Sequence, residues 1–394
     1  MYRRSGWLPR LAPLASSIHT GVPLGAPMSD ADLEPFFAAA REGRGDAVLQ
    51  AVGRQPLLLE ARDPHNGGTA LHSLARLSAA PAVAKLIAAG ADVEARDRNF
   101  CSPLHLAARA DASVAGADAA AGRDGAIIET LRALLKGGAR VGARDSFGLT
   151  ALHHAAQAGH PPACEFLLSL NTTLRQPRAP IEADTNAEER PLHLAAAGGH
   201  ADVVRCLLEH GAHPGKTNYL GETPLHLAAR GGDAPRHLAA LRTLCEAAWK
   251  ADLNVPTARA GETPLHTACG LGHTRAVLAL LGAPNTQRQG ESREVDASRR
   301  NRLGQTPKDV AAAQGFGDVV EALDAAAASA KARAARSLRQ QEEGLQRAMR
   351  EMRVASSGAP PARAAPLSPR GGLRDGMGIL AEESREEEEV EEEE

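Results

Sequence analysis

Apolar and polar positions alternate in a regular order from about residue 29 to residue 330. A short polar block leads into a run of Leu and Ala, a Gly-containing break follows, and a second run rich in Leu and Val comes next, as at residues 203–208. Within each run the apolar residues recur three or four positions apart, which indicates a helix with one buried face. The pattern therefore predicts pairs of short helices joined by glycine turns.

One block of four residues marks the start of each helix pair. It reads Thr or Ser, then Pro or Ala, then Leu-His, and its copies begin at Thr69, Ser102, Thr150, Arg190, Thr223 and Thr263, with a degenerate copy at Thr306. The starts are 33, 48, 40, 33, 40 and 43 residues apart, so the base period is 33 residues with insertions. A period of this length is typical of repeat proteins, in which neighbouring units bury each other's apolar faces.

The residues of the block have local roles in starting a helix. Thr or Ser is a preferred N-cap, and Pro suits the first helical turn. We expect the His of each block to tie the helix start to its neighbours by hydrogen bonds. Because it recurs once per repeat, these histidines should form a row and not a metal centre.

These blocks resemble those of the ankyrin repeat family, over roughly residues 29–328. The resemblance implies an all-α repeat solenoid of helix-turn-helix-β-hairpin units stacked into a curved array, with disordered termini. Residues 29–58 are expected to form an N-terminal capping helix pair that turns Phe36 and Phe37 toward the first full repeat. Residues 59–328 would then form an array of about seven units, closed by the degenerate last copy.

Departures from the repeat predict local irregularities. Arg190 replaces the capping Thr, and Phe100 replaces the turn glycine before Ser102, so we expect distorted hairpins there. The insert at 110–124 falls between the two helices of its repeat and is expected to form a loop. Extra residues at 169–187 and 283–301 are expected to lengthen hairpin loops.

Composition and charge narrow the class of protein. The chain has 394 residues, 43% apolar and only 3% aromatic, with a net charge of −3. The charge is segregated, because residues 382–394 hold ten Glu and residues 331–353 hold seven basic side chains. The central part is close to neutral, which argues against direct nucleic-acid binding. No apolar stretch is long enough for a membrane span.

The segments outside the array have their own compositions. Residues 1–28 contain three Arg and no acid, which suits either a mitochondrial transit peptide or an extension upstream of a start at Met28. Residues 329–353 predict a basic helix with a stripe of Leu338, Leu345, Met349 and Met352, either a partner or coiled-coil dimer helix or a solvated helix end. Residues 354–394 predict a disordered linker and acidic tail. The expected compartment is the cytoplasm or the nucleus, with mitochondrial targeting as the alternative.

Candidate chemistry is sparse. The five cysteines are far apart, which does not suit a disulfide framework or a metal cluster. Cys164, Cys206, Cys245 and Cys269 fit buried positions in helices. Residues 211–217 resemble a phosphate-binding loop but are one residue too short and follow a helix. With no convergent acid–base set, we expect no enzyme activity, no cofactor and no metal.

The hairpin tips carry the candidate binding residues. Phe147, Leu220 and Leu303 occupy the same position, three before the block, and Tyr219 precedes Leu220. An exposed apolar residue on a polar loop often marks a partner contact. The family resemblance adds first-helix positions that face the groove: Arg109, Gln157, Ala197 and Arg230.

We therefore predict a non-enzymatic scaffold or adaptor that binds another protein through the concave face and hairpin tips of a monomeric ankyrin solenoid. The alternative is a regulator of a transcription factor, similar to the inhibitors of Rel-type factors, that masks a basic partner with the array and the acidic tail. The absence of an Asp-Ser-Gly phosphodegron in the sequence argues against that alternative.

Overall fold

The computed structural model describes residues 30–110, 120–170, 179–247, 252–282 and 295–357. The predictions for residues 1–28 and 358–394, and for residues 171–178 and 283–294 of the two longer hairpin loops, lie outside these residues. The chain divides into two units, Met1–Ala330 and Lys331–Glu394. The helices are α1 (Asp30–Arg41), α2 (Gly45–Arg54), η1 (Pro56–Leu59), α3 (Ala70–Arg76), α4 (Ala80–Ala88), α5 (Pro103–Arg109), α6 (Ala120–Lys136), α7 (Ala151–Ala158), α8 (Pro161–Leu168), α9 (Pro191–Gly198), α10 (Ala201–Glu209), α11 (Pro224–Arg230), α12 (Pro235–Glu246), α13 (Pro264–Gly270), α14 (Thr274–Leu281), α15 (Pro307–Ala313) and α16 (Gly317–Ser357).

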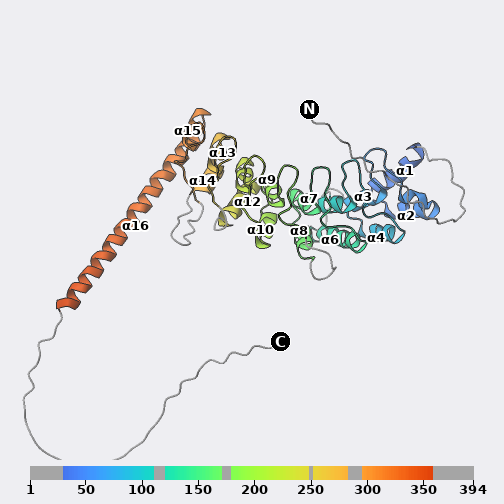
Figure 1. Cartoon of the computed structure of the whole chain (residues 1–394), viewed down its shortest axis with the longest axis horizontal. Coiled ribbons are helices and arrows are strands. Elements are labelled where there is room, and N and C mark those ends of the chain that lie inside the picture. Colours follow the sequence, from blue (N-terminus) through green and yellow to red (C-terminus); the bar gives the residue numbers. More distant parts are fainter. Residues whose placement is uncertain (1–29, 111–119, 171–178, 248–251, 283–294, 358–394) are drawn as a thin grey trace, which may run out of the picture. The chain divides into compact units, whose positions relative to one another are not determined.

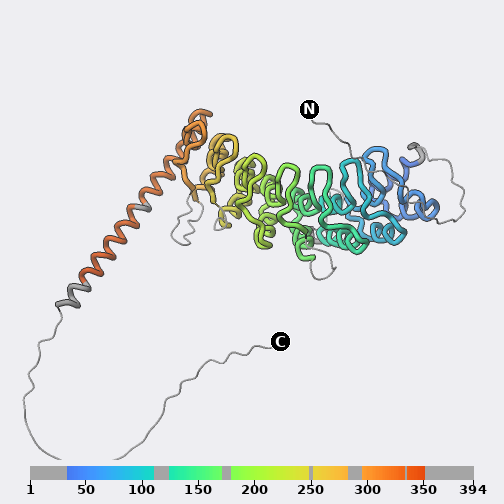
Figure 2. Tube along the Cα trace, in the orientation of Figure 1, coloured from blue at the N-terminus to red at the C-terminus, as the bar shows by residue number. Residues whose placement is uncertain are grey.

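Two rows of helices build the first unit (Figures 1 and 2). The first helices of successive pairs, α3, α5, α7, α9, α11, α13 and α15, pack side by side. The second helices, α4, α6, α8, α10, α12 and α14, form the other row, and α1 and α2 pack on α3 and α4. Each helix inside a row has neighbours on both sides, which is how a chain of short helices can bury a continuous core.

The repeated histidines join each repeat to the next, which confirms their predicted role. In each intact block His Nδ1 accepts a hydrogen bond from the backbone N–H of the N-cap residue, for example 3.1 Å from Thr223 N to His226 Nδ1. The Nε2–H of His226 then donates to the carbonyl of Glu262 in the next repeat, at 3.1 Å. The six bridging histidines, here called the histidine ladder, are His72, His105, His153, His193, His226 and His266.

The degenerate seventh block, which is the last one in the array, has Asp309 in place of the ladder histidine. Asp309 Oδ2 accepts from Thr306 N at 2.9 Å, so the carboxylate replaces the imidazole as acceptor at the helix start. A carboxylate has no N–H to donate onward. Among the described residues, no further hairpin loop follows this block to receive such a bond.

The loops between helix pairs end in hydrogen-bonded tips. Within a tip, Asp145 N donates to Leu149 O at 2.9 Å, and the equivalent bond recurs in the other loops, as from Asn218 N to Glu222 O. One backbone hydrogen bond joins each tip to its neighbour, such as the bond from Asn186 N to Phe147 O at 2.9 Å. No strand occurs in the described part of the chain, so these tips are linked turns and not the regular β-hairpins of the expected unit.

The distortion expected at Phe100 and Arg190 is wrong. Phe100 adopts the left-handed conformation with a φ of 59°, and Glu188, two residues before Arg190, does the same at 56°. These are the values that glycine adopts in the other loops, so the tips keep their shape at the small strain that a side chain at positive φ brings. Arg190 N still donates to His193 Nδ1, at 3.2 Å.

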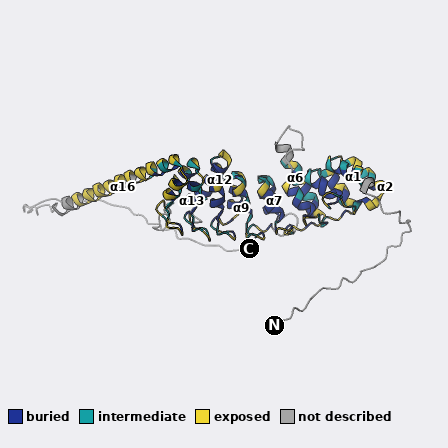
Figure 3. Ribbon diagram, turned by 90° about the horizontal axis from the view of Figure 1, so that it is seen from above, coloured by how far each residue is buried: buried dark blue, intermediate teal, exposed yellow. Residues whose placement is uncertain are grey.

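Small side chains allow the helices of the first row to pack closely. Ala155 and Ala156 are fully buried in α7, and Phe37 of α1 is fully buried at the N-terminal end of the array. Figure 3 shows the buried residues along the helices of the array and the exposed ones on the loops and outer surfaces. The expected loop over residues 110–124 needs one correction, because α6 begins at Ala120 and takes in the last five of those residues.

The second unit contains residues 331–357 of α16. Leu338, Leu345 and Met349 are exposed on this helix. Among the described residues, no helix has the length and apolar character needed to cross a membrane.

Candidate functional site

The predicted tip residues lie along one line of linked loops. Phe147 is 63% exposed, Tyr219 58% and Leu303 80%. Their loops belong to the series of tips that are joined to one another by backbone hydrogen bonds. One of these bonds runs from Tyr219 N to Ala187 O, at 3.3 Å. Because each tip is held by its neighbours, these apolar side chains are presented to solvent by a fixed framework.

Leu220 differs from the other tip residues because it is half-buried. It lines a cavity of about 420 Å³ between the loops and the first-row helices α11, α13 and α15. Arg230 lines the same cavity, so the structure brings together one predicted tip residue and one predicted helix residue. The remaining lining includes Glu222, Arg259, Glu262, Leu271 and Gln314.

Two of the charged residues that line this cavity pair with each other. Arg230 forms an ion pair with Glu222, whose side chain is nearly buried. The Glu222 carboxylate is also contacted by Asn218 Nδ2 at 3.3 Å. Arg230 is therefore held in place by the loop that precedes its helix. Its side chain lines the cavity, and its charge is already paired with a carboxylate of the same protein.

Arg109 and Gln157 lie at the C-terminal ends of α5 and α7 and are both exposed. Gln157 also accepts at its backbone carbonyl, from His200 Nε2 at 3.1 Å. The structure places these two residues on adjacent first-row helices, away from the cavity that contains Leu220 and Arg230.

Phe100 is a surface residue that sequence reasoning did not select. It is 63% exposed, as much as Phe147 on the adjoining tip. The signal was present in the sequence, since Phe100 occupies the turn position that is glycine in most other loops. A side chain at that left-handed position cannot turn into the loop and is directed outward.

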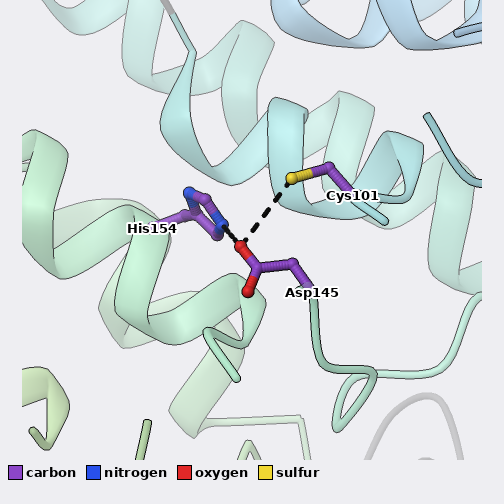
Figure 4. A group of neighbouring side chains, drawn as sticks. All are labelled: Cys101, Asp145 and His154. Carbon is purple, nitrogen blue, oxygen red and sulfur yellow. Dashed lines mark hydrogen bonds and ion pairs between the residues drawn. The ribbon is translucent and has the colours of Figure 1, made fainter. Parts of the chain in front are cut away.

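A buried cluster of Cys101, Asp145 and His154 lies beneath the second and third loops (Figure 4). Asp145 Oδ2 is 3.0 Å from His154 Nε2 and 3.8 Å from the Cys101 sulfur. The other oxygen, Oδ1, accepts from the backbone N–H groups of Phe147 and Leu149, at 2.9 and 2.8 Å. The cluster thus holds the tip that presents Phe147.

The three side chains of this cluster could each offer one ligand atom to a metal ion. Burial, and then the nearby carboxylates of Asp97 and Asp145, raise the pKa of Cys101 to about 12, so the thiol stays protonated. Burial opposes ionisation of Asp145, but hydrogen bonds from His154, Leu149 and Phe147 outweigh it and lower the pKa of the carboxyl. A protonated thiol that donates to a carboxylate is a hydrogen-bonded core group, and we assign the cluster a structural role.

The predicted burial of Cys164, Cys206, Cys245 and Cys269 holds for three of the four. Cys206 on α10 is instead half-buried and packs against the core, and Cys101, for which no burial was predicted, is buried as well. Burial, followed by Glu165 and Glu209, raises the pKa of Cys206 to about 11. Cys206 is nevertheless the most accessible thiol of the five.

We expect Cys206 to be labelled first by a maleimide under native conditions, at least ten times faster than the other four thiols, because their labelling requires local opening. Peptide mapping by mass spectrometry after short labelling times measures the order. The Cys206→Ser variant should lose the fast phase only. A fast phase that persists in this variant would contradict the exposure order.

Family models of ankyrin repeats match the chain. A model of three repeat copies matches residues 118–218 and 177–257, and a model of a single repeat matches residues 260–289. Residues 118–257 and 260–289 therefore match ankyrin repeats, as the recurring block predicts. Ankyrin repeats form a protein–protein interaction module.

The curated relatives share only a part of their length with this chain. They include human "Transient receptor potential cation channel subfamily A member 1" (27% identical over 208 residues), human "SH3 and multiple ankyrin repeat domains protein 2" (33% over 163) and "E3 ubiquitin-protein ligase XBAT33" of Arabidopsis thaliana (33% over 141). The alignments cover 46%, 41% and 35% of this chain but 18%, 8% and 25% of the relatives. Among solved structures, the human ASB11 ankyrin repeat domain is 23% identical with a TM-score of 0.49, covering 65% of this chain and 96% of that chain.

Proposed function

We propose that this chain is a non-enzymatic scaffold or adaptor that binds a partner protein through the hairpin tips and the adjoining face of the first-row helices. The observation that supports it best is the line of exposed apolar side chains on linked tips, Phe147, Tyr219 and Leu303. Exposed aromatic residues on a rigid polar framework are the residue types that dominate binding energy at protein interfaces. Since the tips are tied to one another, the partner would bind with little rearrangement of the array.

The double variant Phe147→Asp/Tyr219→Asp is expected to lose at least nine-tenths of the partner that the parent chain captures from lysate. Each substitution places a carboxylate where an apolar contact would be desolvated. The measurement is quantitative mass spectrometry of captured proteins, after circular dichroism has shown that the variant is folded.

Leu57→Asp supplies the matched control, because Leu57 is 70% exposed but lies on η1, away from the later tips. Capture by the control should equal capture by the parent. If the tip variant keeps the partner and Leu345→Asp loses it, the site lies on α16 and the proposed site residues are wrong.

The transcription-factor regulator is the second candidate, and the ten glutamates of residues 382–394 favour it. A basic DNA-binding domain captured by the full chain and lost when residues 382–394 are deleted would support this candidate. Equal capture with and without that segment would leave the tips as the proposed site.

A further inference from the structure

The first three loops carry a surface with a distinct character. It is formed by loops 62–68, 96–102 and 144–150, and we call it the basic loop surface. Its outward-facing residues are Arg62, Arg96, Arg98, Arg144, Phe100 and Phe147. All are exposed except Arg96, which is half-buried.

Backbone carbonyls hold the guanidinium groups in place. Arg62 Nη1 donates to Arg96 O at 2.6 Å, Arg96 Nη1 to Arg144 O at 3.4 Å, and Arg144 to Asp184 O. Arg98 points back along the array, with Nη2 2.7 Å from Pro64 O. A carbonyl fixes the direction of a guanidinium without neutralising its charge, and the group has five N–H donors, so several remain for a ligand on Arg62, Arg98 and Arg144. Arg96 differs because its Nη2 also lies 3.5 Å from Glu94 Oε2 in an ion pair.

The acidic residues of the same loops are buried or accept hydrogen bonds from their own loop. Asp63 is buried, and Asp145 belongs to the cluster with Cys101 and His154. The Asp97 carboxylate accepts from the backbone N–H groups of Asn99 and Cys101, both at 2.8 Å. The exposed charge on these loops is therefore positive.

Two aromatic rings accompany these cations. Phe100 and Phe147 are on adjoining tips, which are linked by Ser146 N to Asn99 O at 3.0 Å. Both rings are mostly exposed. Arginines beside exposed rings suit a ligand that combines carboxylates with apolar side chains.

Three of the later loops carry a glutamate at one shared position. Glu189, Glu222 and Glu262 occupy the position directly before the repeat block, where the second and third loops have Cys101 and Leu149. Burial, and then the neighbouring charge of Glu222, raises the pKa of Glu189, which indicates crowded carboxylates. An acidic ligand would therefore be attracted more strongly by the first three loops than by the next two, over residues 184–189 and 218–222.

We propose that the basic loop surface binds a short acidic peptide segment of a partner protein, with its carboxylates on Arg98 and Arg144 and an apolar side chain against Phe100 and Phe147. This inference rests on the proposed function and adds the chemistry of the partner. The short length of the cationic surface, bounded by carboxylates, favours such a peptide over an extended nucleic acid.

The test uses the full chain and a synthetic fluorescein-labelled peptide, rich in glutamate with one central phenylalanine, measured by fluorescence anisotropy. A peptide with glutamine for every glutamate is the ligand control. We expect the glutamate peptide to bind at least tenfold more tightly at low salt, and to lose most of that advantage in 0.5 M salt because exposed ion pairs are screened.

Arg98→Glu/Arg144→Glu is expected to weaken binding of the glutamate peptide at least tenfold. The control Arg205→Glu/Arg275→Glu changes the net charge equally at exposed arginines of α10 and α14, and should change affinity less than twofold. Equal losses in both double variants, or equal affinity of the two peptides for the parent chain, would overturn the proposal. The peptide comparison needs no variant, so it stands even if the arginine substitutions unfold the chain.

Other occupants give different outcomes. A single-stranded RNA oligonucleotide that binds more tightly than the peptide, and is lost in the same variant, would assign the surface to nucleic acid and overturn the proposal. Peptide binding that appears only after removal of residues 382–394 would make the chain's own glutamates the occupant, and would also overturn it. Capture of a partner through Phe147 and Tyr219, together with failure of the peptide test, would leave the proposed function intact and reject only the partner chemistry.

Discussion

Lowering the pH from 7.5 to 5 is expected to unfold most of the array. Burial lowers the pKa of His105, His153, His193 and His226 from 6.5 to about 4, although the backbone carbonyls that each contacts oppose the shift. The unfolded chain therefore binds protons more readily than the folded one. This part of the stability is complete above pH 6.5 and is lost as the pH falls toward 4.

The expected size of the acid effect is large. At pH 5 each of these four histidines would contribute roughly 2 kcal/mol of destabilisation, or about 8 kcal/mol together. Domains of ordinary stability have about 5–15 kcal/mol in total. Urea unfolding followed by circular dichroism at pH 7.5, 6 and 5 measures the loss, read as a shift of the midpoint.

A single substitution separates the histidine ladder from general acid effects. His226→Asn removes one titrating group, so the number of protons taken up on unfolding between pH 6.5 and 4.5 should fall by about one. Asn can still accept from the N-cap backbone, as Asp309 does in the last repeat. His213→Gln is the control, because His213 is exposed and lies outside the ladder. An equal change of proton uptake in both variants would exclude the ladder as the main cause.

The repeat architecture was predictable from the sequence because its signals are local. Thr223, Pro224 and His226 act within one helical turn, and the same chemistry recurs at a fixed period. The ladder bond from His226 to the next repeat follows from that period, since stacked units place equivalent atoms at equivalent distances.

The candidate site was less predictable because its contacts join residues far apart in the chain. Cys101 and Asp145 meet across 44 residues, and their contact depends on how two loops stack. The pairing of Arg230 with Glu222 also depends on the direction of a side chain at a helix end. Phe100 was misjudged for a different reason: a non-glycine residue can adopt a left-handed turn conformation at modest cost when its neighbours hold the loop.

Gly221 and Gly304 offer a matched test of how strongly adjacent tips are coupled. They occupy the same turn position with φ values of +76° and +77°. A Cβ added at Gly221 would lie 2.4 Å from the backbone nitrogen of Ala258 on the next tip, whereas one added at Gly304 meets nothing within 4 Å. The two positions therefore share the backbone strain and differ in the close approach of a neighbouring loop.

We expect Gly304→Ala to lower the free energy of unfolding by about 1 kcal/mol, because a side chain at positive φ strains the backbone. Gly221→Ala should cost about 3 kcal/mol or more, because the added methyl also forces the two tips apart and breaks the bond from Ala258 N to Leu220 O, which is 2.9 Å long. Urea unfolding at pH 7.5 gives both values. Equal losses of unfolding free energy in the two variants would mean that the tips move apart freely. That result would contradict the fixed arrangement of the tips on which the proposed binding surface depends. A larger cost at Gly221, accompanied by a second unfolding step, would show that the bonds between tips carry cooperativity from one repeat to the next.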